Sequence, residues 1–102
     1  MTLITYFEAL FLKEIEFQKG AIAVYHPEIG KALILGRTHT PSDEAFEALN
    51  KFTELELVDV LIADIDVKDS PAFYTVSDNG LEELKKFALY PIKRTIPKFL
   101  KP

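Results

Sequence analysis

Three aspartates close together are the first candidate for chemistry, because carboxylates are the usual ligands of calcium and magnesium. Asp64, Asp66 and Asp69 follow an apolar stretch. A helix-loop-helix calcium site needs another oxygen ligand two residues on, a glycine and a distal glutamate. Lys68 stands where that next ligand would be, so the pattern fails. We interpret these carboxylates as a solvated strand end and turn, and expect no metal.

The other residue types that catalyse reactions are scattered along the chain. His26 and His39 are the only histidines and there is no cysteine, whereas zinc usually requires three or four such ligands. Thr40 or Ser42 could cap a helix that begins here, and Asp43 suits the positive end of its dipole, while the members of a catalytic triad converge from different elements. The glycines are isolated from one another, so no phosphate-binding loop is indicated. We expect no catalytic residue and no cofactor.

Hydrophobic periodicity predicts the elements that position the charged groups. The expected elements are a helix over 5–17 started by a capping box of Thr5 and Glu8, a strand over 21–25, a helix over 42–55, a strand over 57–67, a strand over 72–76 and a helix over 80–89 capped by Ser77. The two later strands should pair antiparallel around the turn at Ser70 and Pro71. The apolar parity of 57–67 switches after Ile62, which indicates a bulge or a strand that leaves its partner.

Residues 27–36 leave two alternatives. Pro27 could open a short helix that ends at Gly36, with Glu28 in its first turn. Otherwise 21–25 and 31–35 are the two strands of a hairpin, and Gly30, which disfavours a helix, lies in its turn.

Two stretches resemble the winged helix-turn-helix superfamily. Residues 48–58, with Leu49, Phe52 and an apolar strand entry, are similar to the end of its third helix, and residues 74–84 are similar to its last wing strand and following helix. The resemblance covers about 27–88 and implies an α+β fold: a three-helix core, a C-terminal β-hairpin wing, a following helix and a basic tail. It favours the helix for 27–36. The sequence departs from the family at Glu56, where a glycine is usual.

The resemblance implies DNA binding through the third helix, but the charges oppose this. That helix carries Asp43, Glu44, Glu47 and Glu54 against Lys51, and the wing carries Asp64, Asp66 and Asp69 against Lys68. Because phosphate contacts need cations, these surfaces would repel a duplex. We therefore expect a non-catalytic protein-interaction regulator or adaptor with an acidic recognition helix. The alternative is a DNA-binding transcriptional regulator that acts as a dimer through its basic tail.

The expected organisation is one domain over 1–89 followed by a basic arm over 90–102. The arm interleaves cations with apolar side chains, namely Lys93, Arg94, Ile96, Lys98, Phe99 and Leu100. It could pack on its own body or on a second copy, dock on an acidic protein, or touch a nucleic-acid backbone. No apolar run approaches the roughly 18 residues that span a bilayer, and no signal peptide is indicated, so we expect a cytoplasmic protein without a membrane partner.

Overall fold

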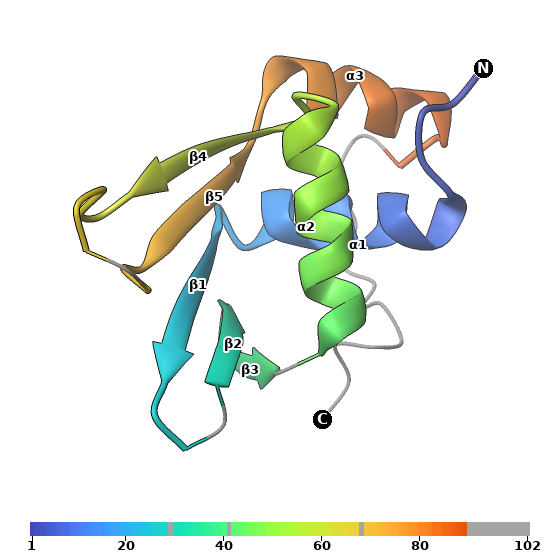
Figure 1. Cartoon of the computed structure of the whole chain (residues 1–102). Helices are drawn as coiled ribbons and strands as arrows, with labels where there is room; N and C mark the ends of the chain where they lie inside the picture. Colours follow the sequence, from blue (N-terminus) through green and yellow to red (C-terminus); the bar gives the residue numbers. More distant parts are fainter. Residues whose placement is uncertain (29, 41, 68, 90–102) are drawn as a thin grey trace.

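The computed structural model describes residues 1–28, 30–40, 42–67 and 69–89 (Figure 1). Its elements are α1 (Tyr6–Phe17), β1 (Ala21–His26), β2 (Gly30–Leu35), β3 (Thr38–Thr40), α2 (Asp43–Glu54), β4 (Val58–Ile62), β5 (Ala72–Val76) and α3 (Asp78–Lys86). The predicted α+β class is confirmed. None of the helices in these residues combines the length and the apolar composition that crossing a bilayer requires.

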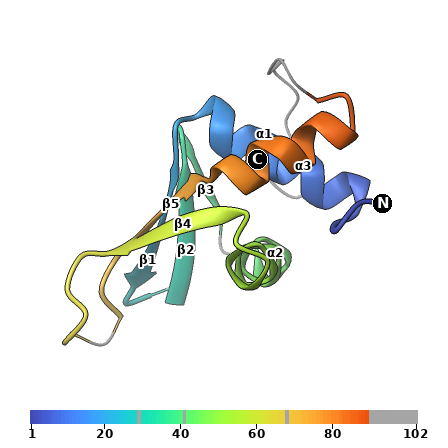
Figure 2. The same cartoon turned by 90° about the horizontal axis from the view of Figure 1, so that it is seen from above.

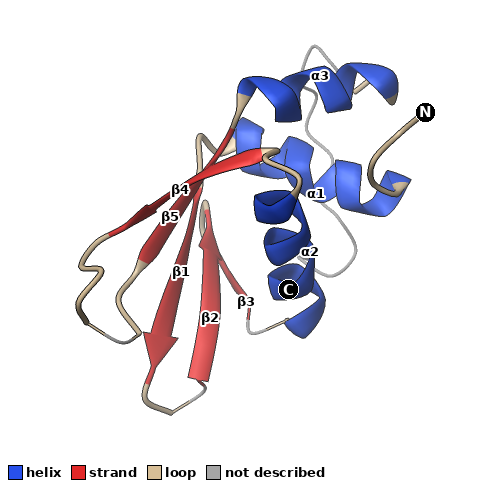
Figure 3. Cartoon of the chain, turned by 45° about the horizontal axis from the view of Figure 1, so that its top comes forward, coloured by secondary structure: helices blue, strands red, loops and turns tan. Residues whose placement is uncertain are grey.

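The strands form one five-stranded antiparallel sheet in the order β3-β2-β1-β5-β4. Ala23 of β1 lies opposite Leu33 of β2 on one side and Ala72 of β5 on the other, while Val60 of β4 lies opposite Tyr74. The three helices lie on the same side of the sheet (Figure 3). Consequently β4 forms one edge of the sheet, and its far half extends with β5 beyond the helices (Figure 1).

Each helix begins at the cap that the sequence predicts. Thr5 and Glu8 form a reciprocal capping box, in which the Thr5 N–H donates to Glu8 Oε1 at 2.7 Å. Ser42 accepts the Ala45 N–H at the start of α2, and Ser77 accepts the Gly80 N–H at 3.1 Å at the start of α3. These side chains satisfy N–H groups that have no partner within the helix.

A single core joins the helices to the sheet. It is made of Ile4, Ala9, Phe11, Leu12, Ile15, Ala21, Leu33, Leu35, Ala45, Ala48, Leu49, Phe52, Leu57, Val58 and Leu84. The rings of Phe11 and Phe52, from α1 and α2, lie 5.8 Å apart between centroids. Seen from above, α1 and α3 lie beside each other at one end, with α2 covering the sheet (Figure 2).

The helix favoured for 27–36 is wrong, because this segment is the second strand of a hairpin. Tyr25 pairs with Lys31 and His26 with Gly30 across the turn. Gly30 has a φ of 77°, which lies outside the helical region and is inexpensive only for glycine. A second turn at Gly36 then leads into β3, a short strand that the sequence analysis does not predict.

The strand predicted over 57–67 ends at Ile62, because the chain turns there. The Ala63 N–H still bonds to the Pro71 carbonyl, but the Asp64 N–H donates to Ser70 Oγ instead of continuing the ladder. Of the two explanations for the switch in apolar parity, the strand leaving its partner is the correct one. The predicted antiparallel pairing with 72–76 is confirmed over β4 and β5.

The element order does not establish a winged-helix core, because β2 stands where the second helix of a helix-turn-helix would be. Glu56, where the family usually has glycine, nevertheless has a left-handed φ of 59°. Its carbonyl accepts the Ser77 hydroxyl at 2.7 Å, which fixes the entry into β4 against the start of α3. The backbone geometry that glycine favours is thus kept here with a glutamate.

Glu56→Gly is expected to raise the free energy of unfolding by up to about 1 kcal/mol, because glycine adopts this φ without a Cβ penalty. The hydrogen bond from Ser77 reaches a backbone carbonyl, so it survives the change. Urea unfolding of both proteins measures the difference. Glu47→Gly, at an exposed position inside α2, is the control and should lower stability by about 1 kcal/mol. Destabilisation by both changes would contradict strain at position 56.

Candidate protein-interaction surface

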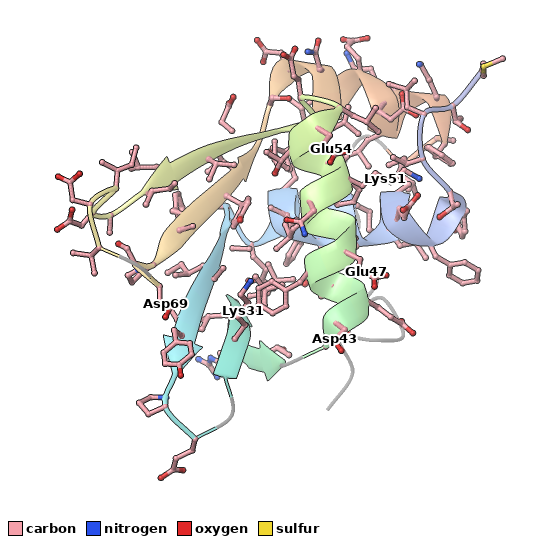
Figure 4. The ribbon with its side chains drawn as sticks, viewed as in Figure 1. Lys31, Asp43, Glu47, Lys51, Glu54 and Asp69 are labelled. Carbon is pink, nitrogen blue, oxygen red and sulfur yellow. The ribbon has the colours of Figure 1, made fainter. Side chains whose placement is uncertain are left out.

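The acidic side chains predicted on the third helix are exposed along α2. Asp43, Glu44, Glu47 and Glu54 all face solvent, and the labelled members follow the helix from one end to the other (Figure 4). Asp43 and Glu44 lie in the first turn of the helix, at the positive end of its dipole, where carboxylates are favourable. We call this set the acidic face of α2.

Lys51, the one cation on α2, is used within the fold. Its Nζ lies 3.0 Å from Glu8 Oε1 and ties α2 to the first turn of α1. Burial alone would raise the pKa of Glu8, but hydrogen bonds from Thr5 and Lys51 and the lysine charge lower it below the usual value. The acidic face therefore has no free cation among the described residues with which to contact a phosphate.

The aspartates after β4 build the turn. The Asp66 N–H donates to Asp64 Oδ1 at 3.1 Å, and the Asp64 N–H donates to Ser70 Oγ at 2.8 Å. Asp64, Asp66 and Asp69 are all exposed. Among the residues that the structure describes, no group of three or more His, Asp or Glu side chains could hold a metal ion.

The predicted arm cannot be placed, because Lys93, Arg94, Ile96, Lys98, Phe99 and Leu100 lie outside the described residues. Its role stays a prediction. The backbone of His26 lies at the end of β1, opposite Gly30. The backbone of His39 lies in β3, opposite Ile34 near the other end of β2.

Strand β4 exposes apolar side chains on both faces of the sheet. Val60 and Ile62 point to the helix side and are 38% and 47% exposed, because α2 does not extend over them. Leu61 points to the other side and is 70% exposed beside Phe73. The turn adds Ile65 and Val67, which are also exposed. We call these exposed side chains the apolar hairpin: Val60, Leu61, Ile62, Ile65, Val67 and Phe73.

The outer edge of β4 presents backbone groups to solvent. Within an antiparallel ladder, residues alternate between those bonded to the neighbouring strand and those facing away from it. The Leu57 carbonyl and the Ala63 N–H both bond to the β5 side. The alternation therefore directs the N–H and C=O groups of Val58, Val60 and Ile62 outward. No strand of the described chain pairs with this edge.

Besides a hollow of about 530 Å³ between Thr53, Val58 and Asp78, two smaller hollows lie on opposite faces of the sheet. One, of about 250 Å³, is lined by Ala23, Val24, Tyr25, Lys31, Phe46, Asn50, Asp69, Ser70, Ala72 and Tyr74, with Lys31 and Asp69 at its sides (Figure 4). The other, of about 230 Å³, is lined by Ile22, Leu61, Ala63, Pro71, Ala72 and Phe73. Both are smaller than the roughly 300–1,000 Å³ typical of small-molecule sites. We assign neither a ligand, but the second continues the apolar hairpin across the sheet.

The acidic face of α2 is predictable from the sequence, whereas the apolar hairpin is not predicted. The run of Val, Ile and Leu in 57–67 is equally typical of a buried strand, and the switch in apolar parity after Ile62 does not show which of its side chains are exposed. The sequence does offer one signal. Ile65 and Val67 alternate with charged residues next to the predicted turn, where apolar side chains are expected to be exposed.

Comparisons of the chain with protein-family models, with curated proteins and with solved structures found no match.

Proposed function

We propose that this chain is a non-catalytic protein-interaction module that binds its partner along the apolar hairpin. The observation that carries the proposal is the edge of β4, where outward backbone groups and exposed Val60, Leu61 and Ile62 occur together. Soluble proteins usually protect such edges with charges, prolines or a covering element, since an unprotected edge pairs with other chains. Strand addition uses these same features: backbone bonds supply affinity and alternate side chains supply specificity.

The acidic face of α2 would give the proposed module a preference for protein partners with basic surfaces. Its exposed carboxylates attract basic surfaces and repel phosphates, so they favour protein partners over nucleic acid. Long-range attraction mainly accelerates association, whereas the desolvated apolar contact holds the complex. The role that we propose is that of a regulator or adaptor.

A photo-crosslinking amino acid placed at Leu61 tests this proposal in the cell of origin. We expect it to form discrete adducts with protein, because Leu61 would lie within the contact. The matched control is the same group at Glu82, an exposed position on α3 away from the hairpin. The proposal is wrong if both positions give the same faint, non-specific adducts.

A second experiment places the crosslinking group at Ile65 and compares the natural Leu61 with Leu61→Asp. The Leu61→Asp change should abolish the adducts with protein partners. Leu61 is exposed, so this change should alter stability by less than about 0.5 kcal/mol. Loss of adducts with unchanged thermal unfolding would separate binding from folding. Adducts that persist at full yield would place the contact elsewhere.

A further inference from the structure

We propose that the strand added to the β4 edge is β4 of a second copy of this chain, antiparallel and centred on Val60. This inference rests on the proposed function, because it names the partner of the same edge. The two sheets would then join into one continuous sheet through a twofold axis. Hydrogen-bond alternation, charge and side-chain exposure each support this register.

The outward backbone groups of β4 match their own copy. In the register centred on Val60, Val60 lies opposite Val60 of the second copy, and Val58 lies opposite its Ile62. These are the three residues whose N–H and C=O groups point away from β5. Val60 and Ile62, the two exposed residues among these three, thus find partners for their outward groups, while Val58 is only 5% exposed and would pair at the rim of the core.

The neighbouring registers are less favourable. Centring the pair on Asp59 would place that carboxylate directly opposite its own copy, at the close spacing of a non-hydrogen-bonded pair. Centring it on Leu61 would place Val58 opposite Asp64, whose N–H already donates to Ser70. In the register on Val60, Asp59 faces Leu61 instead, and neither conflict arises.

Pairing in this register would cover the exposed apolar side chains on both faces. On the helix side of the sheet, Val60 would meet Val60, and Ile62 would lie opposite Val58, whose side chain is already buried in the core. On the other side, Leu61 would lie opposite Asp59 of the second copy, next to Phe73 of its own. A peptide from another protein could pair with the same edge. Binding such a peptide would not require that the sequence of β4 match its own copy about Val60.

Single cysteine substitutions test the register of the proposed pair directly, because the chain has no cysteine of its own. Val60→Cys should form a disulfide-linked dimer under mild oxidation, since paired Cα atoms are about 5.5 Å apart and disulfides span about 4.4–6.8 Å. Asp59→Cys and Leu61→Cys are the matched controls. In the proposed register each lies diagonal to its own copy, about 7–8 Å away, and should crosslink at least 10-fold less.

Val60→Pro tests the backbone contribution while keeping an apolar side chain. The Val60 N–H points away from β5, so proline there should leave the monomer folded, as proline does at sheet edges. Losing one donor from each copy should weaken dimerisation roughly 10-fold or more by sedimentation equilibrium. Phe7→Ala removes an apolar side chain on α1 that is more exposed than Val60, at 68% against 38%, and should leave the dimerisation constant unchanged.

The outcomes separate the inference from the proposed function. A disulfide dimer of the Val60→Cys protein, with weak controls, supports self-pairing. Preferential crosslinking at position 59 or 61 overturns the register, and a monomer that yields no disulfide dimer overturns self-pairing. In that last case adducts at Leu61 with other proteins would leave the proposed function standing. Salt gives an independent check: self-pairing of two acidic chains should strengthen with ionic strength, whereas weakening would contradict it.

Discussion

Phe52→Ala is expected to lower the free energy of unfolding by about 3–5 kcal/mol. The Phe52 side chain is fully buried on α2 and its ring packs 5.8 Å from that of Phe11, so truncation leaves a cavity between the two helices. The loss combines apolar surface returned to water with the contacts that the surrounding atoms no longer make. Urea unfolding followed by circular dichroism measures it.

Two controls make this result specific. Phe52→Leu keeps most of the volume and should cost clearly less than the alanine change. Glu47→Ala, on the exposed side of the same helix, should alter stability by less than about 0.5 kcal/mol. If Phe52→Ala and Glu47→Ala had equal effects, α2 would not be packed as described.

Glu83→Gln is expected to lower stability at neutral pH by about 1–3 kcal/mol and to flatten its dependence on pH in the acid range. Glu83 is 1% exposed on α3, accepts the Leu3 N–H, and pairs with Lys86 at 2.9 Å. These contacts anchor the N-terminal segment to α3. Glutamine keeps the shape but loses the charge that strengthens both contacts.

The sign of the pH effect follows from the pKa of Glu83. Burial alone would raise this pKa, but the backbone N–H of Leu3 and the ammonium of Lys86 outweigh burial and lower it below 4.5. A carboxylate with a lowered pKa in the folded state stabilises the fold above its unfolded pKa, and this contribution is lost as the pH falls through the folded value. The natural chain should therefore lose stability below about pH 4.5 more steeply than the Glu83→Gln protein.

Glu82→Gln is the matched control for this prediction. Glu82 is the neighbouring glutamate and pairs with Lys85 at 3.0 Å, but its side chain is 69% exposed. Exposed pairs contribute little, so this change should shift stability by less than about 1 kcal/mol and leave the acid slope nearly unchanged. Equal slopes for the two variants would show that the buried position of Glu83 has no particular effect.

The local signals in the sequence predict most of the helical structure. Capping by Thr5, Ser42 and Ser77 fixes where the helices start, since each cap depends on residues only three positions away. The hairpin of β4 and β5 is likewise predictable from two apolar runs around Ser70 and Pro71. These features depend on short-range contacts, which sequence patterns report well.

The remaining features depend on long-range contacts. Residues 31–35 are almost wholly apolar and show neither helical nor alternating periodicity, so the pattern alone could not exclude a helix that the family resemblance favours. The edge position of β4 follows from β1 pairing with β5 rather than with β4, and no local signal encodes that choice. The acidic face of α2 was predictable for the opposite reason, because exposed carboxylates on one helix follow from periodicity alone.

Amide hydrogen exchange of β4 tests the central claim, that its outer edge binds a protein strand. The isotope-labelled full chain would be compared in dilute buffer, at high concentration and in an extract of its cell of origin. The N–H groups of Val60 and Ile62 point outward and should exchange fast in dilute buffer and markedly more slowly when the edge is paired, while that of Leu61, which points toward β5, should change little. If Val60 and Ile62 exchange as fast in the extract and at high concentration as in dilute buffer, the edge of β4 is not a binding surface.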